Sequence, residues 1–256
     1  MRSHLALTSA FALATLVAAS ANAATIVVPN GQTNALGNGQ TQQPLEVDGT
    51  PGSRFQQVYD AGQFSALGSS ESITAFAFRA KQPLFVGNSV TVSNVLIRFS
   101  TTQRESTIDS PTNNGINGAL DSNVGPNATT VYSGPLTLTA ATIGTVESYY
   151  NVVLQTPFAY SKGAGNLLLD FVVPAGATIT GNGFNGSFSQ FDTVTGDALG
   201  ANANDGVASA ATSGAADPIG ANTTTGLVTR FTTVVPEPTS LGVIAGLGAV
   251  LARRRR

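Results

Sequence analysis

Apolar and polar residues alternate with a period of two along much of the middle of this chain. The alternating stretches are rich in β-branched and aromatic residues, and they cover residues 72–80, 90–101, 129–139, 149–158 and 166–173, with a last one at 226–235. In a strand, successive side chains point to opposite faces, so this pattern predicts β-strands. Between 95 and 99 both faces carry apolar residues, which predicts a strand that is partly covered on both sides.

The segments between these stretches carry the residues of turns and loops. Clusters of Gly, Asn, Pro, Ser and Thr occupy 111–118 and 121–127, and no helical period is present outside the two ends of the chain. The fold class predicted for 53–235 is all-β, an antiparallel β-sandwich of jelly-roll-like type. Residues 24–52 are predicted to be an irregular lead-in, and 196–226 a long loop or weak edge strands.

The N-terminal end has the composition of a secretory signal peptide. Residues 1–23 begin with one basic residue, Arg2, continue with an apolar stretch at 5–19, and end in a small-residue Ala-Asn-Ala pattern. This order predicts export, with the Sec machinery as a partner and cleavage between Ala23 and Ala24.

The C-terminal end consists of three parts in a fixed order. They are the motif Pro236, Glu237 and Pro238, the uncharged apolar run 239–252, and the basic residues Arg253, Arg254, Arg255 and Arg256. As a helix, the 14-residue run would span about 21 Å, whereas a hydrocarbon core is about 30 Å thick. Such a helix is a poor permanent anchor, and the arginines would stop on the cytoplasmic side. The open alternatives are an ordinary tail anchor after a Pro-rich linker and a hydrophobic end without function.

This three-part tail resembles the PEP-CTERM sorting signal of bacteria. The resemblance implies processing at Pro236–Pro238 by exosortase, a membrane-embedded cysteine transpeptidase, after a transient stage in the inner membrane. It also implies a place at the cell surface or in the extracellular matrix, linked to exopolysaccharide and biofilm. A weaker resemblance covers most of the remaining chain, which is similar to ectodomains of PEP-CTERM proteins without a known activity: residues 54–60, 73–79, 156–158, 165–170 and 226–231.

The composition removes several kinds of chemistry. The chain has no Cys and no Trp, and its one His, His4, lies in the predicted signal peptide. Disulfides, thiolate or imidazole metal sites, cysteine nucleophiles and Ser-His-Asp triads are therefore excluded from the mature protein. Residues 24–235 hold seven basic and thirteen acidic residues, a net charge of −6. This sparse acidic surface argues against nucleic acid. We predict no catalytic residues, no metal and no cofactor.

A few acidic residues are candidates for a site. Calcium takes oxygen ligands, and the best stretches for it are Asp192 with Asp197, and Asn202, Asn204 and Asp205 before Gly206. Neither has a complete EF-hand pattern, and solvated loops are the competing interpretation. Asp170 interrupts an apolar stretch, so it is either a carboxylate in a cleft or a residue on a solvent-facing side of a strand.

Three classes of function remain open: a non-catalytic surface or matrix component, a carbohydrate-binding module, and a secreted glycoside hydrolase. The candidates for a sugar platform are Tyr132, Tyr149, Tyr150 and Tyr160. Since Tyr149 and Tyr150 point to opposite faces, at most one of them is expected in the core. A hydrolase needs two carboxylates at a set distance, and the sequence selects no such pair. The Gly242–Gly246 spacing in the tail is either a helix-packing motif or a chance result of many small residues.

Overall fold

The computed structural model describes residues 23–45, 52–68, 71–81, 89–108, 110–111, 113–139, 145–181, 191–195, 206–212 and 221–235. All of them fall in one compact unit, Ala23–Pro236. The predicted signal peptide up to Asn22 and the predicted sorting signal at 236–256 lie outside the described residues. Among those that are described there are strands and three short 3-10 helices, and no α-helix.

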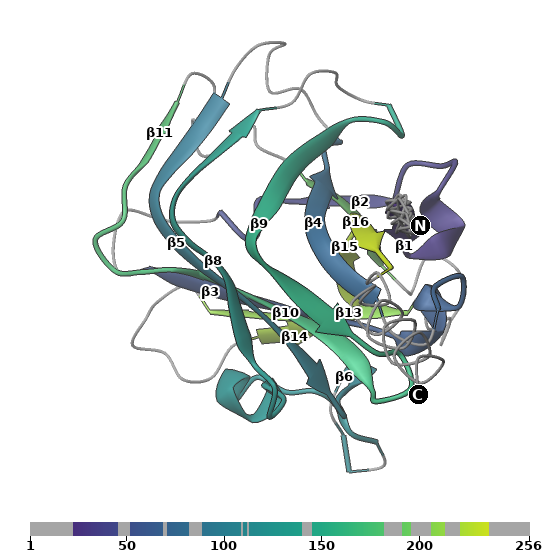
Figure 1. The fold of residues 1–256 in the computed structure, drawn as a ribbon. Coiled ribbons are helices and arrows are strands. Elements are labelled where there is room, and N and C mark those ends of the chain that lie inside the picture. The colour runs from purple at the N-terminus through teal and green to yellow at the C-terminus, as the bar shows by residue number, and fades with distance from the viewer. Residues whose placement is uncertain are drawn as a thin grey trace, which may run out of the picture. The chain divides into compact units, whose positions relative to one another are not determined.

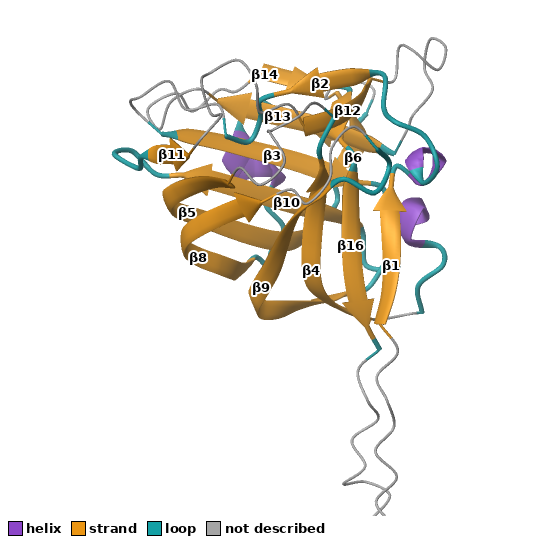
Figure 2. Cartoon of the chain, turned by 90° about the horizontal axis from the view of Figure 1, so that it is seen from above, coloured by secondary structure: helices purple, strands orange, loops and turns teal. Residues whose placement is uncertain are grey.

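The first large sheet has four antiparallel strands, which lie side by side in Figure 2. In spatial order they are β1 (Ala23–Val28), β16 (Thr229–Val234), β4 (Glu71–Arg79) and β9 (Tyr149–Tyr160). The first strand of the chain therefore pairs with the last, with Ala23 opposite Val234. The two ends of the folded unit meet at the same edge of the molecule.

The second large sheet has seven antiparallel strands (Figure 1). Its order is β11 (Ile179–Gly181), β5 (Ser89–Thr102), β10 (Asn166–Val173), β3 (Ser53–Tyr59), β13 (Val207–Thr212) and β14 (Ala221–Thr223), and β8 (Thr129–Thr139) also pairs with β5. The long strand β5 thus has partners on both of its edges.

Smaller elements complete the described structure. A three-stranded antiparallel sheet contains β15 (Thr225–Leu227), β12 (Phe191–Thr195) and β2 (Gly39–Thr41), and a parallel pair contains β6 (Glu105–Ile108) and β7 (Gly115–Ile116). The 3-10 helices are η1 (Asn30–Gln32), η2 (Ala61–Phe64) and η3 (Leu120–Asn123).

The main hydrophobic core lies where apolar faces of the two large sheets meet. Phe231 of β16 is fully buried at its centre, and its ring lies 4.9 Å from that of Tyr59 on β3 and 6.2 Å from that of Phe99 on β5, between centroids. Since these rings come from both sheets, they fix one sheet against the other. A packed pair of antiparallel sheets agrees with the predicted all-β class and is consistent with a β-sandwich.

The alternating stretches correspond closely to observed strands: five of them match β4, β5, β8, β9 and β10 to within two residues. The sixth, 226–235, is divided at Val228 into β15 and β16. The reason is that the two halves have different partners, because β15 pairs with β12 while β16 pairs with β4. The backbone N–H of Val228 donates to the carbonyl of Asp192 at the point of division.

The prediction of an irregular lead-in was wrong, and the prediction of a long loop or weak edge strands at 196–226 was right only for the edge strand β14. The lead-in 24–52 contains most of β1 and all of β2. The described part of 196–226 contains β13, which lies between β3 and β14 as an internal strand. Its residues are small because the face that carries Ala208 and Ala210 is buried in a second, smaller apolar cluster, together with Leu120 of η3. A tightly covered strand needs small side chains, and these give a weak signal in the sequence.

Candidate functional site

The largest fully buried side chain of the described structure is an arginine. Arg79 ends β4 on the face opposite to the core residue Phe78, yet none of its surface is exposed. Its Nε and Nη2 atoms donate to the hydroxyl oxygen of Tyr149 at 3.1 and 2.7 Å, and Nη1 donates to the carbonyl of Ala35 at 2.8 Å. These bonds attach the loop before β2 to the first sheet.

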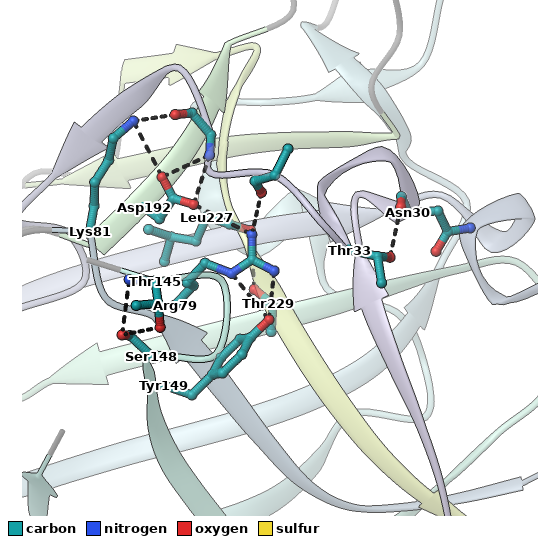
Figure 3. Close-up of polar contacts among 12 residues, drawn as sticks. Asn30, Thr33, Arg79, Lys81, Thr145, Ser148, Tyr149, Asp192, Leu227 and Thr229 are labelled. Carbon is teal, nitrogen blue, oxygen red and sulfur yellow. Dashed lines mark hydrogen bonds and ion pairs between the residues drawn. The ribbon is translucent and has the colours of Figure 1, made fainter. Parts of the chain in front are cut away.

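Asp192 of β12 provides the negative charge for this buried group (Figure 3). Its two carboxylate oxygens accept from the backbone N–H of Gly37 at 3.0 and 2.9 Å. One of them lies 3.7 Å from Nη1 of Arg79, and the other lies 3.4 Å from Nζ of Lys81, which also donates to the Gly37 carbonyl. We call Arg79, Lys81, Tyr149 and Asp192 the Arg79 cluster.

Asp192 is therefore neither a solvated loop residue nor a calcium ligand. The carboxylate is fully buried, and two cations and a backbone amide already satisfy its oxygens. The described residues contain no group of three or more His, Cys, Asp or Glu side chains that is able to hold a metal ion. The other residues considered for calcium, Asp197 and 202–205, lie outside the described part of the chain.

Tyr149 lies between two guanidinium groups. The central carbon of Arg79 is 5.3 Å from the centroid of its ring, and that of Arg230 on β16 is 3.9 Å from it. Arg230 reaches the ring because its neighbours across the ladder are Ala77 on β4 and then Asn151 on β9. The small Ala77 side chain leaves room for Arg230 to cross β4 and donate to Asn151 Oδ1 at 3.2 Å. Cation–π contact holds both arginines against the ring.

None of the four candidate tyrosines forms an exposed platform. Tyr149, Tyr150 and Tyr160 are buried and Tyr132 is half-buried, with its hydroxyl donating to the Pro135 carbonyl. As expected, only one of Tyr149 and Tyr150 belongs to the main apolar core, but the other ring is buried as well. Tyr150 faces the core, where burial raises the pKa of its hydroxyl, and Tyr149 is covered on the outer face by Arg79 and Arg230.

A cavity of about 340 Å³ lies beside the Tyr149 ring, and we call it the Tyr149 pocket. Residues of β1 form part of its wall. Its polar lining comes from η1, the loop after it, η2, the start of β9 and β16, and includes Asn30, Thr33, Asn34, Gln63, Glu147 and Arg230. The carboxylate of Glu147 lies 3.7 Å from Arg230 and its side chain is 75% exposed, so it neutralises Arg230 only weakly.

A second charged network lies on the far face of the seven-stranded sheet. Asp170 of β10 is 1% exposed and accepts from Nε and Nη2 of Arg54 at 2.8 and 3.0 Å. It also accepts from Nη2 of Arg98 at 2.5 Å. Asp170 therefore lies neither on a solvent face nor in an open cleft. It is the buried centre of an ion triad, on the same sheet face as the smaller apolar cluster that contains Leu168 and Leu120.

Asp121 extends this triad to the surface and gives it a pH dependence. Arg54 Nη1 donates to Asp121 at 2.6 Å, and this hydrogen bond and the charge of Arg54 lower the pKa of the Asp121 carboxyl from its ordinary value of 3.8. A carboxyl group whose pKa is lower in the folded state stabilises the fold at pH values above its unfolded-state pKa. This stabilisation is lost as the pH falls through the folded-state pKa.

We expect Asp121 to titrate below 3.8 when its carboxyl carbon is followed by NMR in the folded protein. An unfolded peptide that contains Asp121 serves as the control and should titrate near the ordinary value. A folded-state midpoint at or above that of the peptide would contradict the Arg54 contact.

The structure describes only some of the predicted processing residues. Ala23 and Ala24 are exposed at the start of β1. Pro236, Glu237 and Pro238, Arg253 to Arg256 and the Gly242–Gly246 spacing lie outside the described residues. Within the described part, no helix is long and apolar enough to cross a membrane.

Sequence reasoning missed Arg79 and Arg230 as members of a site. A signal was present for Arg79, because an arginine directly after the apolar stretch 73–78 must either leave the strand or find buried partners. No comparable signal existed for Arg230, whose contacts depend on Ala77 and Tyr149 of other strands. Comparisons with family models, with curated proteins and with solved structures gave no significant match.

Proposed function

We propose that this chain is an exported, non-catalytic protein of the bacterial cell surface or extracellular matrix, sorted through its C-terminal tail. The observation that carries the proposal is the order of the tail: Pro236, Glu237 and Pro238, the apolar run 239–252, and four arginines, directly after the final strand β16. An exosortase processes the chain at the Pro-Glu-Pro motif after Sec-dependent export. The signal peptide, a short C-terminal helix and a jelly-roll-like sandwich are parts of this proposal.

The position of β16 supports processing at this place. β16 pairs with β1 on one edge and with β4 on the other, and its Phe231 lies in the centre of the core. β16 ends at Val234, and the side chain of Val235 after it is half exposed. A cut after this residue would remove none of the strands that the structure describes, so we expect processing to cost the domain little stability.

The buried charges support a structural role for the domain. Asp170 and Asp192 are each held by two basic side chains, and a carboxylate so neutralised is not available as a general base or nucleophile. A glycoside hydrolase would need two carboxylates facing a cleft. Among the residues that line the polar Tyr149 pocket, Glu147 is the only carboxylate.

Replacing both Pro236 and Pro238 by alanine is expected to leave an unprocessed precursor in the membrane fraction. Proline keeps the motif extended and out of the following helix, and extended chain is what a protease binds. Cell fractionation and mass spectrometry of the C-terminal peptide measure the outcome. Deletion of Arg253–Arg256 should instead give secreted protein with its tail intact.

Val235→Ala is the matched control, since it lies next to the motif and is expected to be processed normally. If the double proline variant were processed and distributed like the parent, the sorting function would be wrong, and the tail would be only a weak anchor.

A second candidate function is carbohydrate binding, and the Tyr149 pocket favours it. The pocket is large enough for a small ligand and is lined mainly by amides, hydroxyls and one arginine beside an aromatic ring. The amides and hydroxyls match the hydroxyls of a sugar. This function is compatible with a place in the extracellular matrix.

A further inference from the structure

We propose that the Tyr149 pocket binds the carboxylate-bearing sugar units of an acidic polysaccharide, with Arg230 as the residue that selects the acid. This inference rests on the second candidate function, carbohydrate binding, and names its site and its ligand class. It does not depend on the sorting function.

The first step is that Arg230 holds a fixed position without a strong counter-charge. Its guanidinium lies 3.9 Å from the Tyr149 ring centroid and donates to Asn151, so the side chain is ordered before a ligand arrives. The acidic group paired with it, Glu147, is beyond hydrogen-bond distance at 3.7 Å and largely exposed to water. A carboxylate that enters the pocket can therefore form a charge-assisted bond with Arg230 that water-screened Glu147 does not provide.

The second step is the local charge. The charged residues that line the pocket are Arg230 and Glu147, and the carboxylate of Glu147 is 75% exposed and lies 3.7 Å from Arg230. Residues 24–235 as a whole carry a net charge of −6. A fixed guanidinium whose counter-charge is screened by water attracts an anionic group, while the acidic surface of the domain repels such a group elsewhere. This contrast favours an anionic ligand over a neutral one.

The third step is that the remaining polar groups are uncharged. Asn30 Nδ2, Gln63 Oε1 and Thr33 Oγ1 already bond within the group Asn30, Thr33 and Gln63, so these residues offer a ligand Asn30 Oδ1, Gln63 Nε2 and the acceptor side of the Thr33 hydroxyl. Asn34 adds an amide, and Ile26 and Ala66 add apolar contacts. The amide of Asn34 forms no hydrogen bond with another described residue, so it is open to a ligand. A single basic group among hydroxyl-binding groups suits a uronic acid residue better than a phosphate, which would call for several basic side chains.

The test is calorimetric titration of the folded domain 24–235, which retains every described strand except the first residue of β1 and lacks the tail. The probes are oligogalacturonate, the uncharged galacto-oligosaccharide of the same length, and inorganic phosphate. We expect oligogalacturonate to bind. Raising the NaCl concentration from about 0.05 M to about 0.5 M should lower its affinity, because salt screens the attraction between charges. Arg230→Gln should weaken that binding about tenfold or more, because it removes the charge but keeps a hydrogen-bonding side chain.

Arg104→Gln is the matched control, since it removes the same charge at the β5–β6 turn and should leave affinity unchanged within about twofold once salt screens distant charges. Thermal unfolding of both variants shows that they are folded. Equal binding of the neutral and acidic oligosaccharides, or unchanged binding by Arg230→Gln, would overturn this inference while carbohydrate binding stands. Phosphate that binds as tightly as oligogalacturonate would overturn it as well. Binding of neither oligosaccharide by the folded parent would overturn both.

Discussion

Replacing Asp170 by asparagine is expected to lower the free energy of unfolding by about 3 kcal/mol. The substitution keeps the shape of the side chain and removes the negative charge between Arg54 and Arg98. Two guanidinium groups would then face each other on a covered part of the sheet without a buried counter-charge. The side chain of Arg98 is 31% exposed, so water compensates part of this cost, and the value lies at the lower end for broken buried ion pairs.

Urea unfolding followed by circular dichroism measures this effect, and Asp121→Asn is the matched control. Asp121 also pairs with Arg54, but its side chain is 93% exposed, so we expect its loss to cost less than about 1 kcal/mol. If Asp170→Asn does not fold, the triple variant Arg54→Met, Asp170→Leu and Arg98→Met should restore folding, because apolar residues replace the whole network. Equal stability of Asp170→Asn and Asp121→Asn would show that the triad is not buried as described.

Replacing Arg79 by methionine is expected to cost about 3 kcal/mol or more. Methionine fills much of the space but leaves fully buried Asp192 with Lys81 as its cation. It also leaves the carbonyl of Ala35 and the hydroxyl of Tyr149 without the donors they have in the parent. Unsatisfied buried groups pay the full cost of lost hydration, which is why the expected loss is large.

Arg230→Met is the control for this second variant, since Arg230 contacts the same Tyr149 ring. Its side chain is partly exposed, and we expect a loss below about 1 kcal/mol. Melting temperatures and urea midpoints compare the two variants directly. A loss for Arg230→Met as large as that for Arg79→Met would mean that the Arg79 cluster is not the group that joins β4 to β12 and the loop before β2.

The four positions also separate stability from binding. Arg79 and Asp170 are buried, and we expect their replacement to lower the free energy of unfolding. Arg230 lines the Tyr149 pocket, and we expect its replacement to lower the affinity for an acidic sugar. Asp121 serves as the exposed reference. A variant of Arg230 that remains as stable as the parent is therefore a clean probe of the Tyr149 pocket.

Sequence patterns predicted the strands well where large apolar residues alternate with polar ones. The stretch 129–139 matches β8 at both ends, because buried and exposed side chains alternate there along one strand. The prediction failed for β13, where small residues are buried by a covering segment, and for β1, whose alternation is short and begins at the expected cleavage site.

The candidate sites were less predictable, since burial of a polar side chain depends on distant residues. Asp170 is 116 residues away from Arg54, and Asp192 is 155 residues away from Gly37. The sequence around Asp170 or Asp192 gives no indication of these distant partners. Local patterns therefore offered solvent, cleft or calcium, and none of these is what the fold provides at Asp170 or Asp192.

The sequence by itself determined the β class and the absence of thiol and imidazole chemistry from residues 24–235, because a two-residue period and a missing residue type need no knowledge of neighbours. Tertiary structure alone decided that β1 pairs with β16 and that Tyr149 lies between two arginines. It also placed one weakly paired cation, Arg230, beside a polar pocket. These properties arise from strands far apart in the chain, and only the packing of the sheets brings their side chains within bonding distance.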